Sequence, residues 1–458
     1  MIIVLINYAF AETGITLGLN AIDGYDSGSN SYEYVYYGTF EGQPIKWRVL
    51  DTTSNDGTTP AVFMLSEYTL GNRVFRSDYT ASDANQWSAS DIKEYLQGEF
   101  TENSFEIAEK EAIIATTKTN DTDATDYDRY TLGATNLDNE KLFLLSGSEV
   151  VNTKYGFSSQ SGDDENRKAR SVSAPLGSAM WWRLRSPSSR ITYSAGVVNI
   201  DGWVYGPGVA DNYGLRPALN LNLSSVLFTS SAVEKSTSDI GIFKLSEDTV
   251  SEHKITLLET TRSFSVDNKN IIAGSGENVA INYTGATVGS NEYISLIILK
   301  EDLPIYYGRV LKPITESGTV TITIPSDIPE GEYTIKIFSE QYNGDYKTDY
   351  ASQFQDISLH VCSSSITYNT VYGIAPEILK VETGSRVILP EIKAEGKKFL
   401  GWYKSDNTEF TNGSKVNGNI TLTAKWGEDI AVNENILDTS GANVPELYQG
   451  LKPIKMER

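Results

Sequence analysis

Hydrophobic and polar positions alternate strictly in several short runs in the second half of the chain. These runs lie at residues 293–298, 320–324 and 333–338. Because successive side chains of a strand point to opposite faces, the alternation predicts strands with one buried face. About 100 residues with this pattern, from about 254 to 361, predict an all-β sandwich of about seven strands.

The first half of the chain, from about residue 24 to 243, mixes two periods. Apolar positions at helical spacing predict helices over residues 88–98 and 102–114. Apolar runs predict strands at 44–50, 61–65 and 141–145, and the last run is apolar enough for the centre of a sheet. This block is therefore expected to be α+β.

The length of 458 residues suggests about three domains. A polar, serine-rich stretch at 234–239 is typical of a linker between the first block and the second, which covers 254–361. A third strand-rich block covers 365–426. Residues 427–458 show no periodicity, which favours a linker or a truncated tail.

The first eleven residues form a short apolar run that ends in Ala9-Phe10-Ala11. Small residues at these spacings are typical of a secretory cleavage site, so residues 1–11 are interpreted as a truncated signal peptide. The positively charged leading region is absent, and a buried first strand is the alternative. Export is the favoured interpretation.

Charge and composition exclude several classes of partner. The formal net charge of −22 disfavours nucleic acid and anionic membranes. Cys362 is the only cysteine and there are two histidines, so neither an intramolecular disulfide nor a usual zinc site can form. Without a phosphate-binding glycine loop, no organic cofactor is expected. A calcium site at residues 119–128 remains an alternative, although such an acidic run is more commonly a solvated loop.

The first block resembles a known family through six ordered motifs between Tyr34 and Leu223. They include Ile45-Lys-Trp-Arg-Val-Leu50, Leu184-Arg-Ser-Pro187 and Gly214-Leu-Arg-Pro-Ala-Leu219. The resemblance is to a secreted bacterial domain of unknown function. It implies the C-type-lectin-like fold shared with formylglycine-generating enzymes and with hypervariable ligand-binding proteins.

The chain departs from these relatives in two ways. The enzymes work through a cysteine pair that this block lacks, so the resemblance implies the fold without that chemistry, and we do not expect an enzyme. Arg183 stands where the family has a second tryptophan, which implies altered core packing or a cation on the surface. Trp182, Arg185 and Arg216 recur in the family pattern, and we expect them to be packing and buried ion-pair residues.

The stretch between Ser188 and Tyr213 is rich in Tyr, Ser, Gly and Asn, as adaptable recognition loops are. In hypervariable relatives the corresponding region contacts the ligand. The candidate ligand-binding residues are Arg183, Arg190, Tyr193, Asn199, Asp201, Trp203, Tyr205, Asp211, Asn212 and Tyr213. A surface hairpin from Val197 to Val204, turning at Asp201-Gly202, explains part of the same run equally well.

The later blocks carry two further resemblances. Gly331-Glu-Tyr-Thr-Ile-Lys-Ile-Phe338 is similar to immunoglobulin-like modules of Gram-positive surface proteins, which usually act as spacers. Gly396-Lys-Lys-Phe-Leu-Gly-Trp-Tyr403 and Ile420-Thr-Leu-Thr-Ala-Lys-Trp426 resemble one internalin-type B-repeat, a small β-grasp module. In that module Trp402 and Trp426 are expected to pack the core, and Gly401 to let the strand bend.

Together these features predict an extracellular or cell-surface bacterial recognition or adhesion protein, monomeric, that binds a glycan or a host or bacterial surface protein. Two alternatives remain. Acids such as Asp163, Asp164, Glu165, Asp201 and Asp211 would suit a carbohydrate-active hydrolase of the cell envelope. The whole chain could instead be a structural spacer without a ligand.

Overall fold

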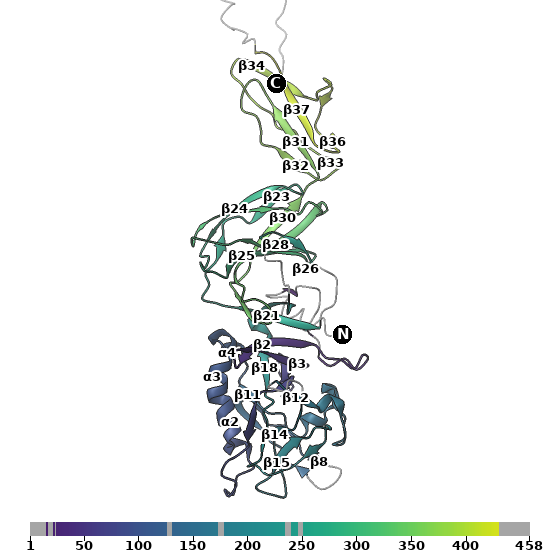
Figure 1. Cartoon of the computed structure of the whole chain (residues 1–458). Helices are drawn as coiled ribbons and strands as arrows, with labels where there is room; N and C mark the ends of the chain where they lie inside the picture. Colours follow the sequence, from purple (N-terminus) through teal and green to yellow (C-terminus); the bar gives the residue numbers. More distant parts are fainter. Residues whose placement is uncertain are drawn as a thin grey trace, which may run out of the picture. The chain divides into compact units, whose positions relative to one another are not determined.

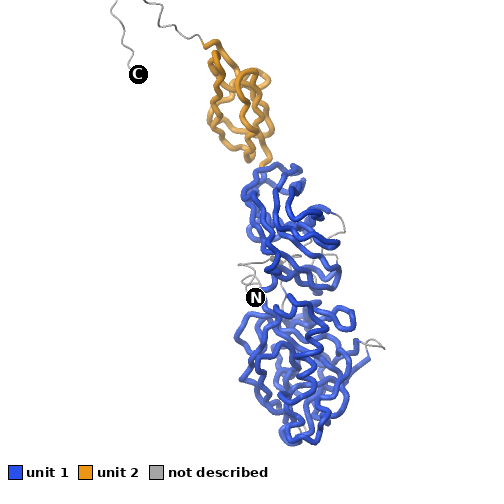
Figure 2. Tube along the Cα trace, turned by 90° about the vertical axis from the view of Figure 1, so that its left-hand side faces the viewer, with its two compact units in different colours: residues 1–361 blue, residues 362–458 orange. Residues whose placement is uncertain are grey.

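Strands dominate the protein in a computed structural model that describes residues 15–16, 22, 24–125, 131–172, 178–233, 240–245 and 251–429 (Figure 1). The chain divides into two compact units, residues 1–361 and 362–458 (Figure 2). Within the described ranges, no helix is long and apolar enough to cross a membrane. The protein is thus a mostly β, multi-sheet chain, as the sequence predicted at that level.

One large sheet of unit 1 extends through both of its sequence blocks. Its main path runs, in spatial order, through β11 (Leu142–Phe143), β18 (Ala218–Asn222), β4 (Pro60–Ser66), β3 (Gln43–Thr53), β2 (Tyr34–Phe40), β21 (Glu252–Leu258), β29 (Asp349–Ala351), β28 (Gly331–Gln341), β25 (Glu292–Lys300), β26 (Leu303–Leu311) and β20 (Phe243–Lys244). The predicted strands at 44–50 and 61–65 correspond to β3 and β4. The run at 141–145 includes buried residues, but its strand β11 lies at the end of this path instead of the centre.

Strand β21 links the first and second sequence blocks within this sheet (Figure 1). Its residues 252–254 pair in parallel with β2 of the first block, and its residues 256–258 pair in parallel with β29 of the second. It also pairs antiparallel with β19 (Val226–Ser231). The blocks share this sheet, because consecutive parts of β21 form hydrogen bonds with a strand of each. Their apolar contacts are also shared, since Leu227 and Phe228 of the first block pack with Ile297 and Phe338 of the second. The expected linker at 234–239 lies outside the described residues.

The second block is built from two sheets that share one core. A three-stranded sheet of β22 (Ser265–Val266), β24 (Asn278–Thr284) and β27 (Gly318–Thr323) packs with β25, β28 and β30 (Gln355–Val361) of the large sheet. Ile281 and Ile322 of the small sheet join Ile294, Ile298 and Ile335 of the large one in this core. The run at 320–324 is therefore a strand with one face in the core, as predicted. The run at 293–298 is a strand too, but both of its faces are buried, because Ile297 packs in a second cluster with Phe228 and Phe338.

The predicted helices are divided differently from what the sequence suggested. Helix α2 (Asp91–Tyr95) is capped by Ser90, whose side chain accepts a hydrogen bond from the Lys93 amide. A π-helical turn at Leu96–Phe100 then carries the chain through Gly98, the expected stop, into α3 (Thr101–Ser104). The predicted second helix is interrupted at Phe105, whose backbone is extended, and resumes as α4 (Ile107–Ala112).

Unit 2 is a small β structure with its own core. Its five-stranded sheet has the order β32 (Leu379–Val381), β31 (Ser364–Asn369), β37 (Ile420–Glu428), β34 (Lys397–Tyr403) and β35 (Glu409–Phe410). Trp402 is buried in the core and Trp426 packs against it, as predicted. Next to Gly401 (φ +131°) the pairing of β34 with β37 shifts register, where the sequence led us to expect a bend.

Candidate functional site

A second sheet of unit 1, together with the segments that connect its strands, carries the candidate ligand-binding residues. Its five strands have the order β16 (Val204–Tyr205), β15 (Ala195–Val198), β14 (Trp182–Pro187), β17 (Asn212–Gly214) and β6 (Asn72–Val74). β15 and β16 form the hairpin that the sequence offered as an alternative, with Val198 opposite Val204. The hairpin and a recognition surface are compatible, because Trp203 and Tyr205 are only half-buried, although β15 is buried along its whole length.

Two adjacent tryptophans at the start of β14 lie on opposite faces of this sheet. The Trp182 side chain is fully buried, donates a hydrogen bond from Nε1 to the Arg167 carbonyl at 3.0 Å and stacks against the Arg216 guanidinium. Trp181, one residue earlier, is only half-buried. Alternation along the chain thus places Trp181 on the outer face.

Four half-buried rings lie next to one another on the outer face, and we call them the aromatic ladder: Tyr213, Trp181, Tyr205 and Trp203. The ring centroids of Trp181 and Tyr213 are 5.5 Å apart, with 18° between the planes. Those of Trp181 and Tyr205 are 5.8 Å apart, and those of Trp203 and Tyr205 are 6.1 Å apart. Rings at these separations are in contact, so the ladder is a continuous aromatic strip.

The turn of the hairpin fixes one end of the ladder. The Asn199 side-chain oxygen accepts hydrogen bonds from the backbone amides of Asp201 and Trp203, each at 2.8 Å. Gly202 adopts φ +89°, and a side chain there would collide with the backbone of Asp164. Trp203 also donates from Nε1 to the Asp163 carboxylate. Asn199 therefore shapes the turn, and its oxygen is already engaged there.

Arg183 lies in the interior, which corrects its place among the candidate ligand contacts. Its side chain is fully buried, so it is not a surface cation. Its Nη2 donates to the carbonyls of Gly208 at 2.7 Å and Asp211, and its guanidinium lies 4.7 Å from the centre of the Tyr213 ring. Burial lowers the pKa of Arg183 to about 10. Its role is to hold the loop before β17 beside the ladder.

The remaining candidates are solvent-exposed. Tyr193 is 57% exposed, and Arg190 is also exposed. Asp201, Asp211 and Asn212 are exposed and lie within two positions of a ladder ring along the chain, and we call these three residues the polar rim. The structure thus brings Trp203, Tyr205 and Tyr213 together and leaves the polar rim beside them.

Buried arginines organise the loops behind this sheet. Arg167 is fully buried and donates to five backbone carbonyls, those of Val150, Ser158, Gln160, Gly162 and Gly202. Arg216, also fully buried, donates to the Ser66 carbonyl at 2.7 Å. Burial lowers the pKa of Arg216 to about 9, and the nearby charge of Arg48 adds to the effect. The prediction that Trp182, Arg185 and Arg216 are interior residues is confirmed.

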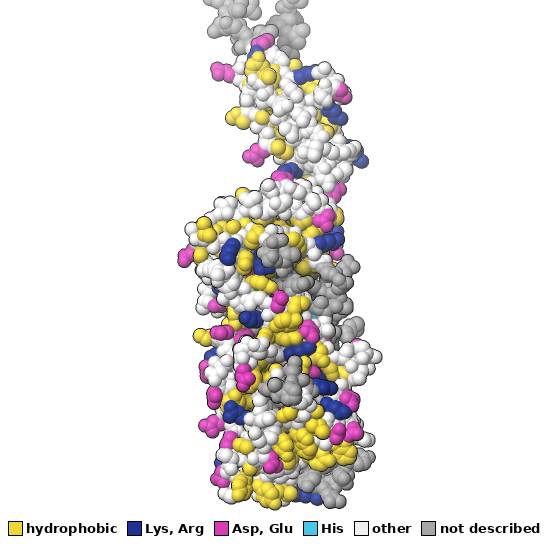
Figure 3. Space-filling model, in the orientation of Figure 1, with side chains coloured by type: hydrophobic (Ala, Val, Ile, Leu, Met, Phe, Trp, Pro, Cys, Tyr) yellow, Lys and Arg dark blue, Asp and Glu magenta, His cyan; other side chains and the backbone are white. Residues whose placement is uncertain are grey.

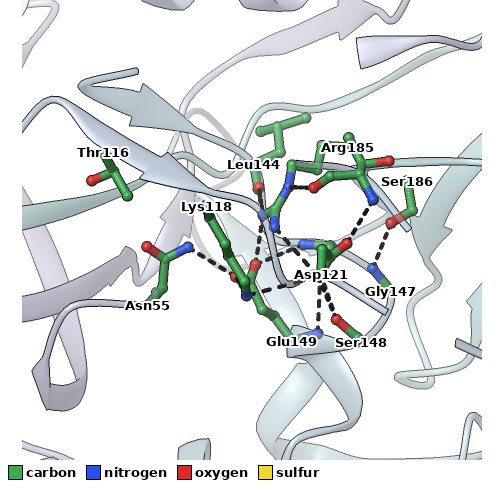
Figure 4. A network of polar contacts seen from close by, with 12 residues as sticks. Asn55, Thr116, Lys118, Asp121, Leu144, Gly147, Ser148, Glu149, Arg185 and Ser186 are labelled. Carbon is green, nitrogen blue, oxygen red and sulfur yellow. Dashed lines mark hydrogen bonds and ion pairs between the residues drawn. The ribbon is translucent and has the colours of Figure 1, made fainter. Parts of the chain in front are cut away.

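A buried ionic network holds the middle of β14 (Figure 4). Glu149 accepts from Arg185 at 2.6 Å and from Lys118 at 2.7 Å, and Asp121 lies 3.7 Å from each of these cations. The two cations keep the pKa of Glu149 well below its usual value despite its burial. Arg185 also donates to the Leu144 carbonyl, so the network ties β14 to the segment after β11.

Asp121 belongs to the acidic run at 119–128 that left calcium open. Its carboxylate accepts hydrogen bonds from the hydroxyls of Ser146 and Ser148 and faces the two cations of the network. Asp126 and Asp128 lie outside the described residues. Among the residues that are described, no three Asp, Glu, His or Cys side chains form a group that could hold a metal ion.

Three of the acids considered for hydrolysis are engaged by other groups. Asp163 accepts from Trp203. The Asp164 carboxylate accepts from the backbone amides of Ser158 at 2.7 Å and Asn166 at 2.9 Å, and Glu165 pairs with Lys168 at 2.5 Å. Asp164 therefore serves as the cap of a short 3-10 helix over Glu165–Arg167.

Sequence reasoning missed three features of this region. Trp181 could have been found, because a strand with Trp182 inside places Trp181 on the other face. Nothing in the local sequence marked Arg167 as a buried residue that contacts five carbonyls. The contact between Asp163 and Trp203 joins positions 40 residues apart, and no local pattern indicates it.

The space-filling view shows hydrophobic side chains gathered over the part of unit 1 where Figure 1 labels β14 and β15 (Figure 3). A separate hollow of about 740 Å³ in unit 1 lies beside α3 and α4. Its acids Glu102 and Glu259 pair with Lys110 and Arg262, and Glu109 takes part in the cap of α4. These three acids of the hollow are therefore already held by an ion pair or a helix cap.

Comparison with known proteins defines a chain built from two recognised modules and an intervening β block. Residues 59–223 match a domain of unknown function, DUF6273. Residues 365–425 match the Listeria-Bacteroides repeat domain. A search of curated proteins finds no match. The aromatic ladder lies entirely within the stretch that matches DUF6273.

Proposed function

We propose that this chain is an extracellular recognition protein and that the aromatic ladder of its DUF6273 domain binds a glycan. The observation that carries the proposal is the strip of four half-buried rings on the outer face of the β14 sheet. Tyr and Trp supply large, rigid contact area with polar edges, which suits ligands that combine C–H surface with hydroxyl groups.

The polar rim supports a glycan as the ligand. Exposed Asp201, Asp211 and Asn212 offer acceptors and donors to sugar hydroxyls beside the rings. Arg167 and Arg183 hold the nearby loops through backbone carbonyls, so little loop ordering has to accompany binding. A C-type-lectin-like fold for this domain, secretion and a monomeric state are parts of the same proposal.

Three acids that could serve hydrolysis already hold hydrogen bonds or ion pairs, which favours binding over hydrolysis. Asp164 is held by backbone amides, Glu165 by Lys168 and Asp163 by Trp203. A retaining or inverting glycosidase needs two carboxyl groups on either side of a scissile bond. We therefore propose that the chain has no hydrolytic activity toward the glycan it binds.

A glycan array probed with the full chain tests this proposal. Binding to one class of glycan, lost in the double variant W203A/Y205A with an unchanged melting temperature, supports it. Binding only to surface proteins on a parallel protein array would replace the glycan with a protein ligand. Release of products from a bound polysaccharide would overturn the assignment as a non-enzyme.

A further inference from the structure

A buried lysine and a buried aspartate meet where the two blocks of unit 1 share a sheet. Lys254 Nζ lies 2.9 Å from Asp349 Oδ1, and both side chains are fully buried. We propose that Lys254 and Asp349 join covalently in the mature protein, forming an amide between the two side chains. This inference is independent of the glycan proposal.

The strands hold the two groups in a fixed relation. Lys254 lies on β21 and Asp349 on β29, and these strands pair in parallel with Thr256 opposite Asp349. Asp349 Oδ1 also accepts from the Asn343 amide at 2.8 Å. The Lys254 ammonium lies 4.5 Å from the centre of the Tyr342 ring. Two reactants fixed in contact by a rigid sheet react as if at very high concentration.

The pair lies among other buried polar groups, including the Arg309 guanidinium, which contacts the same Tyr342 ring as Lys254. Tyr307 and Glu340 are buried near this point and share a hydrogen bond of 2.6 Å, and burial raises the pKa of Tyr307 well above its usual value. An amide carries no charge, so its formation would relieve the desolvation cost of a buried ion pair. The neutral amine and the carboxylic acid are the forms that can react.

The reaction is a balanced condensation. One proton passes from Nζ to a carboxyl oxygen along the 2.9 Å contact. The amine lone pair forms the Nζ–Cγ bond, one Cγ–O bond breaks, and that oxygen leaves as water with the transferred proton and a second proton from Nζ. No atom changes its oxidation state, so no oxidant or reductant is needed.

The product would remove two buried charges and tie the shared sheet together. It would close a loop between two positions that are 95 residues apart in sequence. A chain whose only cysteine is Cys362 has no intramolecular disulfide to do this. The cross-link would connect the strand that enters the second block with a strand close to that block's end.

Intact-mass spectrometry of the purified, denatured full chain tests the proposal. The expected mass is lower than the sequence mass by one water. Trypsin should then leave residues 245–262 joined to residues 348–380, because a modified Lys254 is not cleaved. A full sequence mass, with Lys254 cleaved and the peptides separate, would overturn the proposal and leave an ordinary buried ion pair.

The variant K254R is the matched control. It retains a cation at the same position, but a guanidinium is a poor nucleophile, so its mass should equal its full sequence mass. Loss of water that persists in K254R would arise elsewhere in the chain and would contradict the assignment to Lys254. The wild-type mass decides the question even if a variant folds poorly.

Discussion

Trp181 and Trp182 are neighbours in sequence but lie on opposite faces of one sheet. Trp182 is fully buried, with 4.9 Å between its ring centre and the Arg216 guanidinium, whereas Trp181 stacks on Tyr213 at the outer face. Adjacent residues thus supply a core anchor and a surface ring. This pair allows the structural and the binding role of the region to be separated by mutation.

Replacing Trp182 with alanine should destabilise unit 1, whereas replacing Trp181 should not. Removing a fully buried tryptophan costs about 3 to 5 kcal/mol, and the lost ring would also leave Arg216 without its contact. W181A should change the free energy of unfolding by less than about 1 kcal/mol. Urea denaturation of both variants measures this difference. Equal destabilisation by the two would show that Trp181 is also a core residue.

Arg167 should be irreplaceable by lysine. Its guanidinium serves five carbonyls from separate segments between residues 150 and 202, and an ammonium cannot reach all of them. Because each lost hydrogen bond to a charged donor costs about 1.5 kcal/mol or more, R167K should lose at least about 3 kcal/mol of unfolding free energy. K168R is the control and should be nearly neutral, since the partner of Lys168 is the exposed Glu165. Thermal denaturation that fails to separate the two variants would contradict this role.

The buried network around Glu149 should make the protein sensitive to acid. Arg185 and Lys118 lower the pKa of Glu149 in the folded state, so the folded protein binds a proton here less readily than the unfolded chain. This stabilisation is fully present above the ordinary value of 4.5 and is lost as the pH falls below it toward the folded pKa. The free energy of unfolding should therefore decrease with acidification in that window.

The variant E149Q should flatten this pH dependence while lowering stability at neutral pH. Removing the Glu149 charge leaves Arg185 and Lys118 buried with only the more distant Asp121 carboxylate, at a cost of up to about 3 to 5 kcal/mol. Denaturation curves at neutral pH and below the ordinary glutamate pKa compare the two proteins. A wild-type slope that survives unchanged in E149Q would assign the acid sensitivity to other carboxylates.

Unit 2 should unfold as a separate element when its core is damaged. Trp402 is buried there and donates from Nε1 to the Pro390 carbonyl at 2.7 Å. W402A should cost about 3 to 5 kcal/mol, which is enough to unfold so small a core. Calorimetry should then show loss of one transition and retention of the transition of unit 1. Loss of both would mean that the two cores unfold together.

Strand patterns were well predicted because burial on one face leaves a period of two in the sequence. That signal located β25, β27 and β28, and the core role of Trp402 followed from its motif. The sharing of β21 between two sequence blocks was not predictable in this way. Composition marks a polar connection, but the pairing of β21 with β2 and β29 is a long-range contact that no local pattern encodes.

The arrangement of the candidate site was only partly predictable for a similar reason. Aromatic residues with a loop-like composition pointed to Trp203, Tyr205 and Tyr213, which the fold brings together through Trp181. Arg183 was misplaced, because a charged residue favours solvent unless distant carbonyls are available to receive its hydrogen bonds. Those carbonyls come from residues 208 to 211, and only the folded chain brings them to Arg183.

The most direct test of the recognition role is calorimetric titration of the full chain and of W181A with the glycan selected on the array. Trp181 contacts both Tyr205 and Tyr213 and is central to the ladder. We expect W181A to weaken binding at least about tenfold, or about 1.4 kcal/mol, while its melting temperature stays that of the wild type. Unchanged affinity in W181A would contradict the ladder as the binding surface.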